Sequence, residues 1–322
     1  MKKTIPAVLA VLCLLMLLSQ PGLAYAGACR GLLLWAQVVL PTLLPFMICS
    51  GAIAALGGIP ILTRPFKPIL SGFLGLSQQG SFVFITGLLC GYPMGAKTDS
   101  DFLSQGRISR QEARYLLAIS NHPSPMFVLG YVMPRLILPG FSGGPAASPL
   151  GAACPLWICL AALYLPIIPL SILARHVYFP GKAFHCIPEA AGHGRDCPPF
   201  SFDSHMMSCL ETMAKIGGYI MLFSILALYI LVFPLPRQVP GWLRPALLGA
   251  VEMTTGIELI FEGASGLLRP LLILAAAAFG GLSGIFQTKS VLKNAGLSIR
   301  HYILWKLLHS ALSCILFWAA VI

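Results

Sequence analysis

Charged residues are scarce in this chain, since they make up 10% of its 322 residues and only 10 of them are Asp or Glu. Soluble domains carry about 25% charged residues, so the composition excludes an ordinary soluble domain. The sequence also has no P-loop, no Gly-x-Gly-x-x-Gly fingerprint and no His-Glu-x-x-His motif. ATPase, dinucleotide-binding and metalloprotease functions are therefore without support, and we expect no enzyme.

The formal net charge of +11 does not indicate nucleic-acid binding, because the Lys and Arg residues stand singly between apolar runs. A nucleic-acid surface needs a basic patch or stripe. Hydrophobic residues make up 57% of the chain, and the mean hydropathy is +0.84. The sequence therefore predicts an all-α, polytopic membrane protein whose main partner is the lipid bilayer.

The N-terminus is typical of a secretory signal, with Lys2 and Lys3 before an apolar run from Ile5 to Leu18 and small residues around Ala26. Such a segment is either cleaved or kept as the first transmembrane helix. Because a multispan protein can use this helix as an uncleaved signal-anchor, we expect it to be retained.

The rest of the chain divides into two halves with the same order of segments: a span, a half-length hydrophobic hairpin, a broken helix and another span. Paired interruptions of this kind are typical of transporters built from inverted-topology repeats. We therefore predict a signal-anchor helix at 1–30, a first repeat at 31–173, a cytoplasmic loop at 174–204 and a second, inverted repeat at 205–322. The second repeat is expected to open with an interfacial helix, Met207 to Lys215, before a separate span begins at Ile216.

Two transmembrane helices are expected to break at membrane depth. In the first half, Ser109 and Glu112 form a capping box, and the helix that they open runs into Ser120-Asn121-His122-Pro123-Ser124-Pro125. The two prolines of this run remove N–H donors and stop the helix. In the second half, the break is predicted at Gly280–Gly284. Unwound backbone survives at this depth only inside protein or beside a water-filled cavity, so each break predicts part of a binding site.

Each predicted hairpin is re-entrant and carries an ionisable residue close to its turn. The first ends at Gly91-Tyr92-Pro93-Met94-Gly95-Ala96-Lys97, where Lys97 suits an anionic solute and a salt bridge to a nearby aspartate is the structural alternative. The second contains Glu252. A carboxylate in an apolar run indicates cation coupling or a salt bridge, here to Lys97 or Lys289.

The predicted site combines the two hairpin turns with the two breaks. Its substrate-binding residues are Gly91, Tyr92, Pro93, Gly95, Lys97, Asn121, His122, Ser124, Thr254, Thr255, Ser283 and Gln287, and its coupling or ion-pairing residues are Glu252 and Lys289. His122 fits a buried neutral histidine as well as a proton-coupling group. Ser283 is not flanked by a hydrolase elbow with triad partners, so we do not interpret it as a nucleophile. No metal or other cofactor is predicted, and a coupling Na⁺ or H⁺ stays open.

Positive charge indicates the orientation. A cytoplasmic N-terminus places most Lys and Arg residues on the cytoplasmic side, which is the positive-inside pattern, and makes the two hairpins enter from opposite sides. Lys306, in the last span, is expected to extend its side chain to the membrane surface. The polar loop at 174–204 holds His185, Cys186, His193 and Cys197, whose spacing does not fit a zinc site.

Four runs resemble the sporulation integral membrane protein YlbJ family: Gly91–Lys97, Ser120–Phe127, Glu252–Gly256 and Ser283–Gln287. Proteins of this family carry the nucleoside-recognition Gate domain, which concentrative nucleoside transporters share. The resemblance implies a Gate-type inverted-repeat fold and transport of dipicolinate, a small aromatic dianion, across the outer forespore membrane during sporulation. The alternatives are a nucleoside transporter and a non-transporting assembly protein, partnered with itself or with other sporulation membrane proteins.

Overall fold

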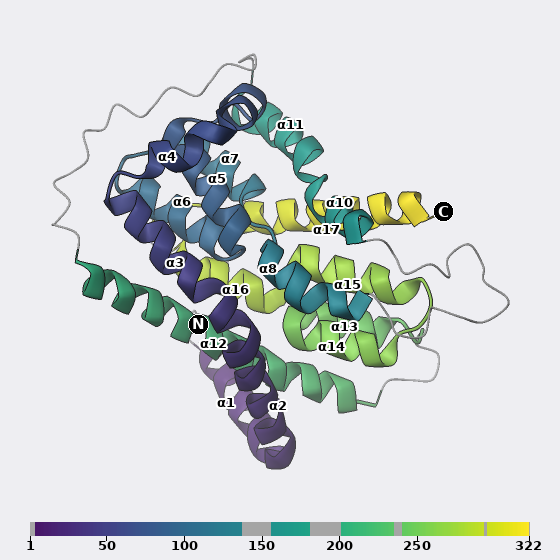
Figure 1. The fold of residues 1–322 in the computed structure, drawn as a ribbon. Coiled ribbons are helices and arrows are strands. Elements are labelled where there is room, and N and C mark those ends of the chain that lie inside the picture. Colours follow the sequence, from purple (N-terminus) through teal and green to yellow (C-terminus); the bar gives the residue numbers. More distant parts are fainter. Residues whose placement is uncertain (1–3, 137–155, 181–200, 235–239, 293–294, 322) are drawn as a thin grey trace.

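The computed structural model describes residues 4–136, 156–180, 201–234, 240–292 and 295–321, and all regular structure in these ranges is helical (Figure 1). This confirms the all-α prediction for the described residues. Five helical segments there are long and apolar enough to cross a membrane: Pro21–Ala55, Leu156–Tyr178, Phe202–Val232, Leu268–Val291 and Ile299–Val321. The loop with His185, Cys186, His193 and Cys197 lies outside the described residues.

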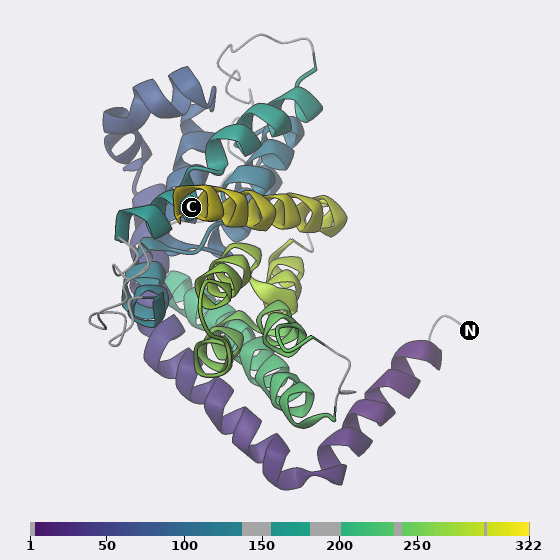
Figure 2. The ribbon, with the colours of Figure 1, turned by 90° about the vertical axis from the view of Figure 1, so that its right-hand side faces the viewer.

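The N-terminal helices α1 (Thr4–Ser19) and α2 (Pro21–Leu34) meet at a sharp turn at Gln20 (Figure 2). The residue before a proline is disfavoured in helical conformation, whereas proline itself fits the first helical position, so this sequence ends one helix and begins another. The turn therefore precedes the boundary predicted at residue 30, which falls within α2. Helix α2 continues through a π-helical turn, η1 (Trp35–Val39), into α3 (Leu40–Ala55).

The first half is built around two adjoining helical interruptions. Its elements are α4 (Ile59–Thr63), η2 (Arg64–Phe66), η3 (Pro68–Phe73), α5 (Gln78–Cys90), α6 (Met94–Ser104), α7 (Arg110–Ile119), α8 (Pro125–Phe127), η4 (Val128–Val132), α9 (Met133–Leu136), α10 (Leu156–Tyr164) and α11 (Ile167–Tyr178). The predicted cap of α7 is confirmed, because Glu112 N–H donates to Ser109 Oγ at 3.1 Å. The predicted break is also confirmed, since the backbone between Ile119 and Pro125 is not helical.

The second half also contains a helix pair followed by a broken helix. Its elements are α12 (Phe202–Val232), α13 (Leu243–Val251), α14 (Met253–Gly263), α15 (Leu268–Phe279), α16 (Gly281–Val291) and α17 (Ile299–Val321). The prediction of a separate interfacial helix at Met207–Lys215 is wrong, because α12 is continuous through these residues. A salt bridge of 2.6 Å between Glu211 and Lys215 lies along this helix, so the polar residues there do not end it.

The break in the second half is shorter than predicted. Only Gly280 lies between the two helices, since α16 is assigned from Gly281, and both glycines have left-handed backbone, with φ of +84° and +70°. Left-handed backbone of this kind strongly favours glycine, which explains why the helix breaks here. Ser283 and Gly284 therefore belong to the first turn of α16 rather than to unwound chain.

Two long helices connect the halves. Helix α17 passes between the first-half helices and the α13–α15 group, and it contacts α7, α10 and α15 (Figures 1 and 2). Helix α12 contacts α2, α3, α13 and α16. Four interruptions of the helical structure lie between these elements: the α5–α6 turn, the break between α7 and α8, the α13–α14 turn and the break between α15 and α16. The two long helices hold these interruptions close to one another.

Candidate functional site

The two interruptions of the first half contact each other directly. The N–H of Tyr92, in the turn between α5 and α6, donates to the carbonyl of His122 at 3.0 Å. The N–H of Ala96, at the start of α6, donates to Asn121 Oδ1 at 2.8 Å. A Cβ atom at Gly95 would collide with the carbonyl of Ser120, so glycine permits this close approach. The asparagine of the break therefore caps the helix that follows the hairpin turn.

The two interruptions of the second half are also adjacent. A Cβ atom at Gly281, just after the second break, would lie 3.1 Å from the N atom of Met253 and 3.2 Å from the carbonyl oxygen of Val251. These two residues flank Glu252, where α13 gives way to α14. Each half thus brings the turn of a helix pair against the break of a longer helix.

Tyr92 joins the two halves. Its hydroxyl donates to the carbonyl of Ala277 at 3.1 Å and to the sulfur of Met253, both of which belong to the second half. The Tyr92 ring also lies beside Gly280, where a Cβ atom would be 3.2 Å from it. One side chain from the first hairpin turn therefore contacts both interruptions of the second half.

The unwound backbone at 120–124 is bonded within the protein. The carbonyls of Ile119, Asn121, His122 and Pro123 accept hydrogen bonds from His122 Nε2, Lys306 Nζ, Tyr92 N–H and the Tyr164 hydroxyl, respectively. These four carbonyls thereby have the partners that backbone groups away from water need. They are not available to a solute as free peptide dipoles.

Lys306 is buried rather than extended to the surface, and this corrects the sequence-based expectation. Its side chain is 3% exposed, its Nζ donates to the carbonyl of Asn121 at 3.0 Å, and it lies 4.7 Å from the centre of the Tyr92 ring. A carbonyl released by the helix break and an aromatic face both attract an ammonium group, which explains the inward orientation. His309, one turn further along α17, has its ring 5.0 Å from that of His122.

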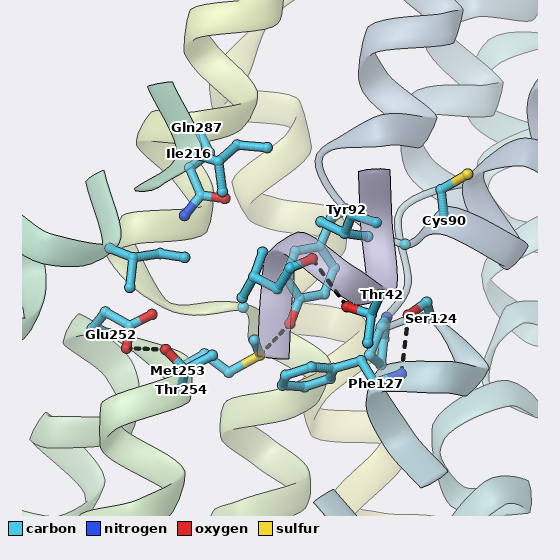
Figure 3. Close-up of a pocket in the computed structure, with 16 residues that line it drawn as sticks. Thr42, Cys90, Tyr92, Ser124, Phe127, Ile216, Glu252, Met253, Thr254 and Gln287 are labelled. Atoms are coloured by element: carbon cyan, nitrogen blue, oxygen red, sulfur yellow. Dashed lines mark hydrogen bonds between the residues drawn. The ribbon is translucent and has the colours of Figure 1, made fainter. Parts of the chain in front are cut away.

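A cavity lies where the two halves meet; it is partly open, and its empty space of about 470 Å³ includes solvent space outside its mouth. Its lining comes from both halves and from α3 and α12: Val39, Thr42, Leu43, Cys90, Gly91, Tyr92, Pro123, Ser124, Phe127, Ile216, Ile220, Glu252, Met253, Thr254, Gly280 and Gln287. Figure 3 shows Tyr92 between Glu252 and Thr254 on one side and Ser124 and Phe127 on the other. The cavity thus combines two aromatic rings with hydroxyl, amide and carboxylate groups.

Glu252 is the one charged residue among the described residues that line the cavity. It is 2% exposed, and its Oε2 accepts hydrogen bonds from the Thr254 hydroxyl and the Thr255 N–H, each at 2.6 Å. The carboxylate thereby caps α14, where the helix dipole also favours negative charge. Among the described residues, no salt bridge joins it to Lys97 or Lys289. Lys97 pairs with Asp101 at 2.9 Å, and Lys289 is exposed.

The structure brings together about half of the predicted site. Gly91, Tyr92, Ser124, Glu252, Thr254 and Gln287 line the cavity. Asn121, His122, Thr255 and Ser283 are buried behind it, where Thr255 bonds to Ser224 and Ser283 accepts from Gln287. Pro93, Gly95, Lys97 and Lys289 do not line it. The described part of the chain holds no group of three or more His, Cys, Asp or Glu residues placed to bind a metal ion.

Sequence reasoning did not identify several lining residues. Thr42, Cys90, Phe127 and Ile216 come from four different elements, and most of them lie in ordinary apolar helices. Two of them carried a usable signal: Pro41 and Pro45 flank Thr42 in α3, and Phe127 ends the run Ser120–Phe127. Tertiary packing, rather than any local motif, places these residues at the cavity.

The chain is 25% identical to the sporulation integral membrane protein YlbJ of Bacillus subtilis (strain 168), in an alignment that covers 94% of this chain and 79% of that protein. No family model and no solved structure matches it. The resemblance inferred from the four sequence runs is thereby confirmed. This chain is a multi-pass integral membrane protein homologous to the sporulation integral membrane protein YlbJ.

Proposed function

We propose that this protein transports a small aromatic solute across a membrane, without catalysing a reaction. The observation that carries the proposal is the cavity, because both halves of the chain and all four helix interruptions contribute to its walls or lie directly behind them. Movement of one half against the other would open such a site alternately to the two sides of the membrane.

The proposal includes two inverted-topology repeats with re-entrant hairpins. Its support is the matching order of elements: α5–α6 and α7–α9 in the first half, α13–α14 and α15–α16 in the second. In both helix pairs, the two helices also meet at a pair of glycines. Gly87 closely approaches Gly95 across the first turn, and Gly249 closely approaches Gly256 across the second. Small residues let helix backbones meet in lipid, where apolar burial does not drive association.

For the substrate, we propose dipicolinate and the outer forespore membrane, with the N-terminus in the cytoplasm. The support comes from the homologue, whose name assigns it to sporulation, and from the Tyr92 and Phe127 rings, which suit a planar solute. Lys97 is outside the cavity lining, and Glu252 is inside it. A dianion therefore requires Glu252 to be protonated or accompanied by a cation when it binds. A nucleoside, in contrast, would use the ionised carboxylate as a hydrogen-bond acceptor.

The test is uptake by purified protein in liposomes, measured with labelled dipicolinate and with labelled uridine. For dipicolinate we expect uptake to increase as the pH falls, because protonation of Glu252 removes the repulsion. Glu252→Gln should keep uptake and remove its pH dependence. The matched control is Glu211→Gln, which neutralises an exposed carboxylate on α12 and should behave as wild type.

Two outcomes would replace the proposal. Accumulation of uridine but not dipicolinate, with uridine uptake reduced about tenfold or more by Glu252→Gln, would indicate a nucleoside transporter. Inert liposomes containing folded protein would favour a membrane assembly component. The internal bonding of the Asn121 and Pro123 carbonyls is compatible with that second function, because a purely structural protein would bond its backbone in the same way.

A further inference from the structure

A carboxylate that forms no salt bridge with the described residues lies inside the first helix pair. Asp99, on α6, is 0% exposed, and neither of its carboxylate oxygens has a hydrogen-bond partner among the described residues. The neighbouring cation, Lys97, donates instead to Asp101 on the outer side of the same helix. A buried carboxylate without hydrogen bonds or a countercharge is strongly destabilising, so this position calls for an explanation.

An unpartnered hydroxyl lies on the facing helix. Contacts at both ends of the α5–α6 interface fix its antiparallel register: Phe82 stacks on Phe102 with 5.7 Å between ring centres, and Gly87 approaches Gly95. Thr86 is adjacent to Gly87 and one turn beyond Phe82. Asp99 lies between Gly95 and Phe102. Both side chains therefore fall within the same interface.

The hydroxyl of Thr86 is available to a ligand. A helical threonine commonly donates to the carbonyl one turn earlier, yet the Thr86 hydroxyl bonds to none of the residues that the structure describes, and the residue is 2% exposed. The carboxylate of Glu112, on α7, acts electrostatically on Asp99 and so makes the region more negative. Glu112 is itself engaged, because its Oε1 accepts from the Ser77 N–H at 2.9 Å.

We propose that the Asp99 carboxylate and the Thr86 hydroxyl bind a Na⁺ ion between α5 and α6. Hard cations take carboxylate, hydroxyl and carbonyl oxygens as ligands. A monovalent ion fits, because Asp99 supplies one full negative charge. The site lies deeper in the hairpin than the Gly91–Pro93 turn, which borders the cavity. Bound Na⁺ would stabilise this helix pair whether or not the protein transports a solute.

The test measures the melting temperature of the purified full-length chain in detergent, in NaCl, KCl or choline chloride at equal ionic strength. We expect NaCl to raise it saturably, as a ligand of the folded state does, and choline to have no effect. Asp99→Asn should abolish the response. Asp101→Asn is the matched control, because Asp101 forms only the half-exposed pair with Lys97, and it should respond as wild type.

A second variant keeps the proposal testable if Asp99→Asn does not fold. Thr86→Val preserves the shape of the side chain and removes one oxygen ligand of the ion. It should raise the half-saturating NaCl concentration about tenfold, if that ligand contributes about as much as a hydrogen bond to a charged group. Equal melting temperatures of the wild type in NaCl and choline would overturn the proposal and would mean that Asp99 is held protonated in the hairpin core. A Thr86→Val response like that of the wild type would also overturn it, because Na⁺ would then bind without the Thr86 hydroxyl.

Discussion

Tyr92→Phe isolates the hydrogen bonds that join the two halves. The substitution keeps the ring, and with it the contacts to Gly280 and to the ammonium of Lys306. It removes the hydroxyl that donates to the Ala277 carbonyl at 3.1 Å, near the end of α15. Because that carbonyl belongs to a buried residue, it would be left without this donor.

The expected loss follows from that geometry. Leaving a buried acceptor unsatisfied lowers the free energy of unfolding by about 1–3 kcal/mol. In proteins of 150–250 residues each kcal/mol corresponds to about 2–4 °C in melting temperature, so a decrease of at least about 2 °C is expected. The measurement is thermal unfolding of the purified variant in detergent.

Tyr25→Phe serves as the control, since Tyr25 is 74% exposed and its substitution should leave the melting temperature unchanged. If Tyr92→Phe melts at the wild-type temperature, the Tyr92 hydroxyl does not connect the halves, and the reasoning about their junction fails. If the variant is less stable, its solute uptake shows whether the same bonds also govern opening of the cavity.

Three further predictions use the same thermal and uptake measurements. Gly95→Ala places a methyl group against the Ser120 carbonyl and should lower the free energy of unfolding by about 1–3 kcal/mol, whereas Gly218→Ala, with nothing nearby, should not. Ser109→Ala removes the cap of α7 and should lower it by about 1 kcal/mol. Lys97→Gln breaks only a surface ion pair, so it should change stability by less than about 1 kcal/mol and leave uptake intact. A large loss of uptake in the Lys97→Gln variant would show that Lys97 takes part in solute binding after all.

The backbone interruptions were largely predictable, because they depend on residues that act locally. Two prolines end a helix wherever they occur, so Ser120–Pro125 could be identified as a break without knowledge of its surroundings. The Ser109 cap is local for the same reason. The extent of the second break was not predictable, because only the packing of Gly281 against the α13–α14 turn shows that α16 resumes so early.

The positions and partners of side chains depend on tertiary contacts, and they were predicted less well than the helix breaks. A lysine in an apolar span was expected to reach the membrane surface, but the Asn121 carbonyl and the Tyr92 ring hold Lys306 inside. Both partners are distant in sequence. Glu252 was expected to serve cation coupling or to form a salt bridge, and in the structure hydroxyl and N–H donors in the next turn of its own chain bind the carboxylate. The position of Lys306 was not predictable because its partners are distant in sequence. The position of the Glu252 carboxylate was not predictable because local donors compete with distant cations for it.

An experimental structure of the protein with a bound solute tests the central claim most directly. We predict solute density in the cavity between the two halves, in contact with Tyr92, Ser124, Glu252 and Gln287. Density at any other position, with this cavity filled by side chains, would contradict the claim that the four helix interruptions of the two halves form one solute-binding site.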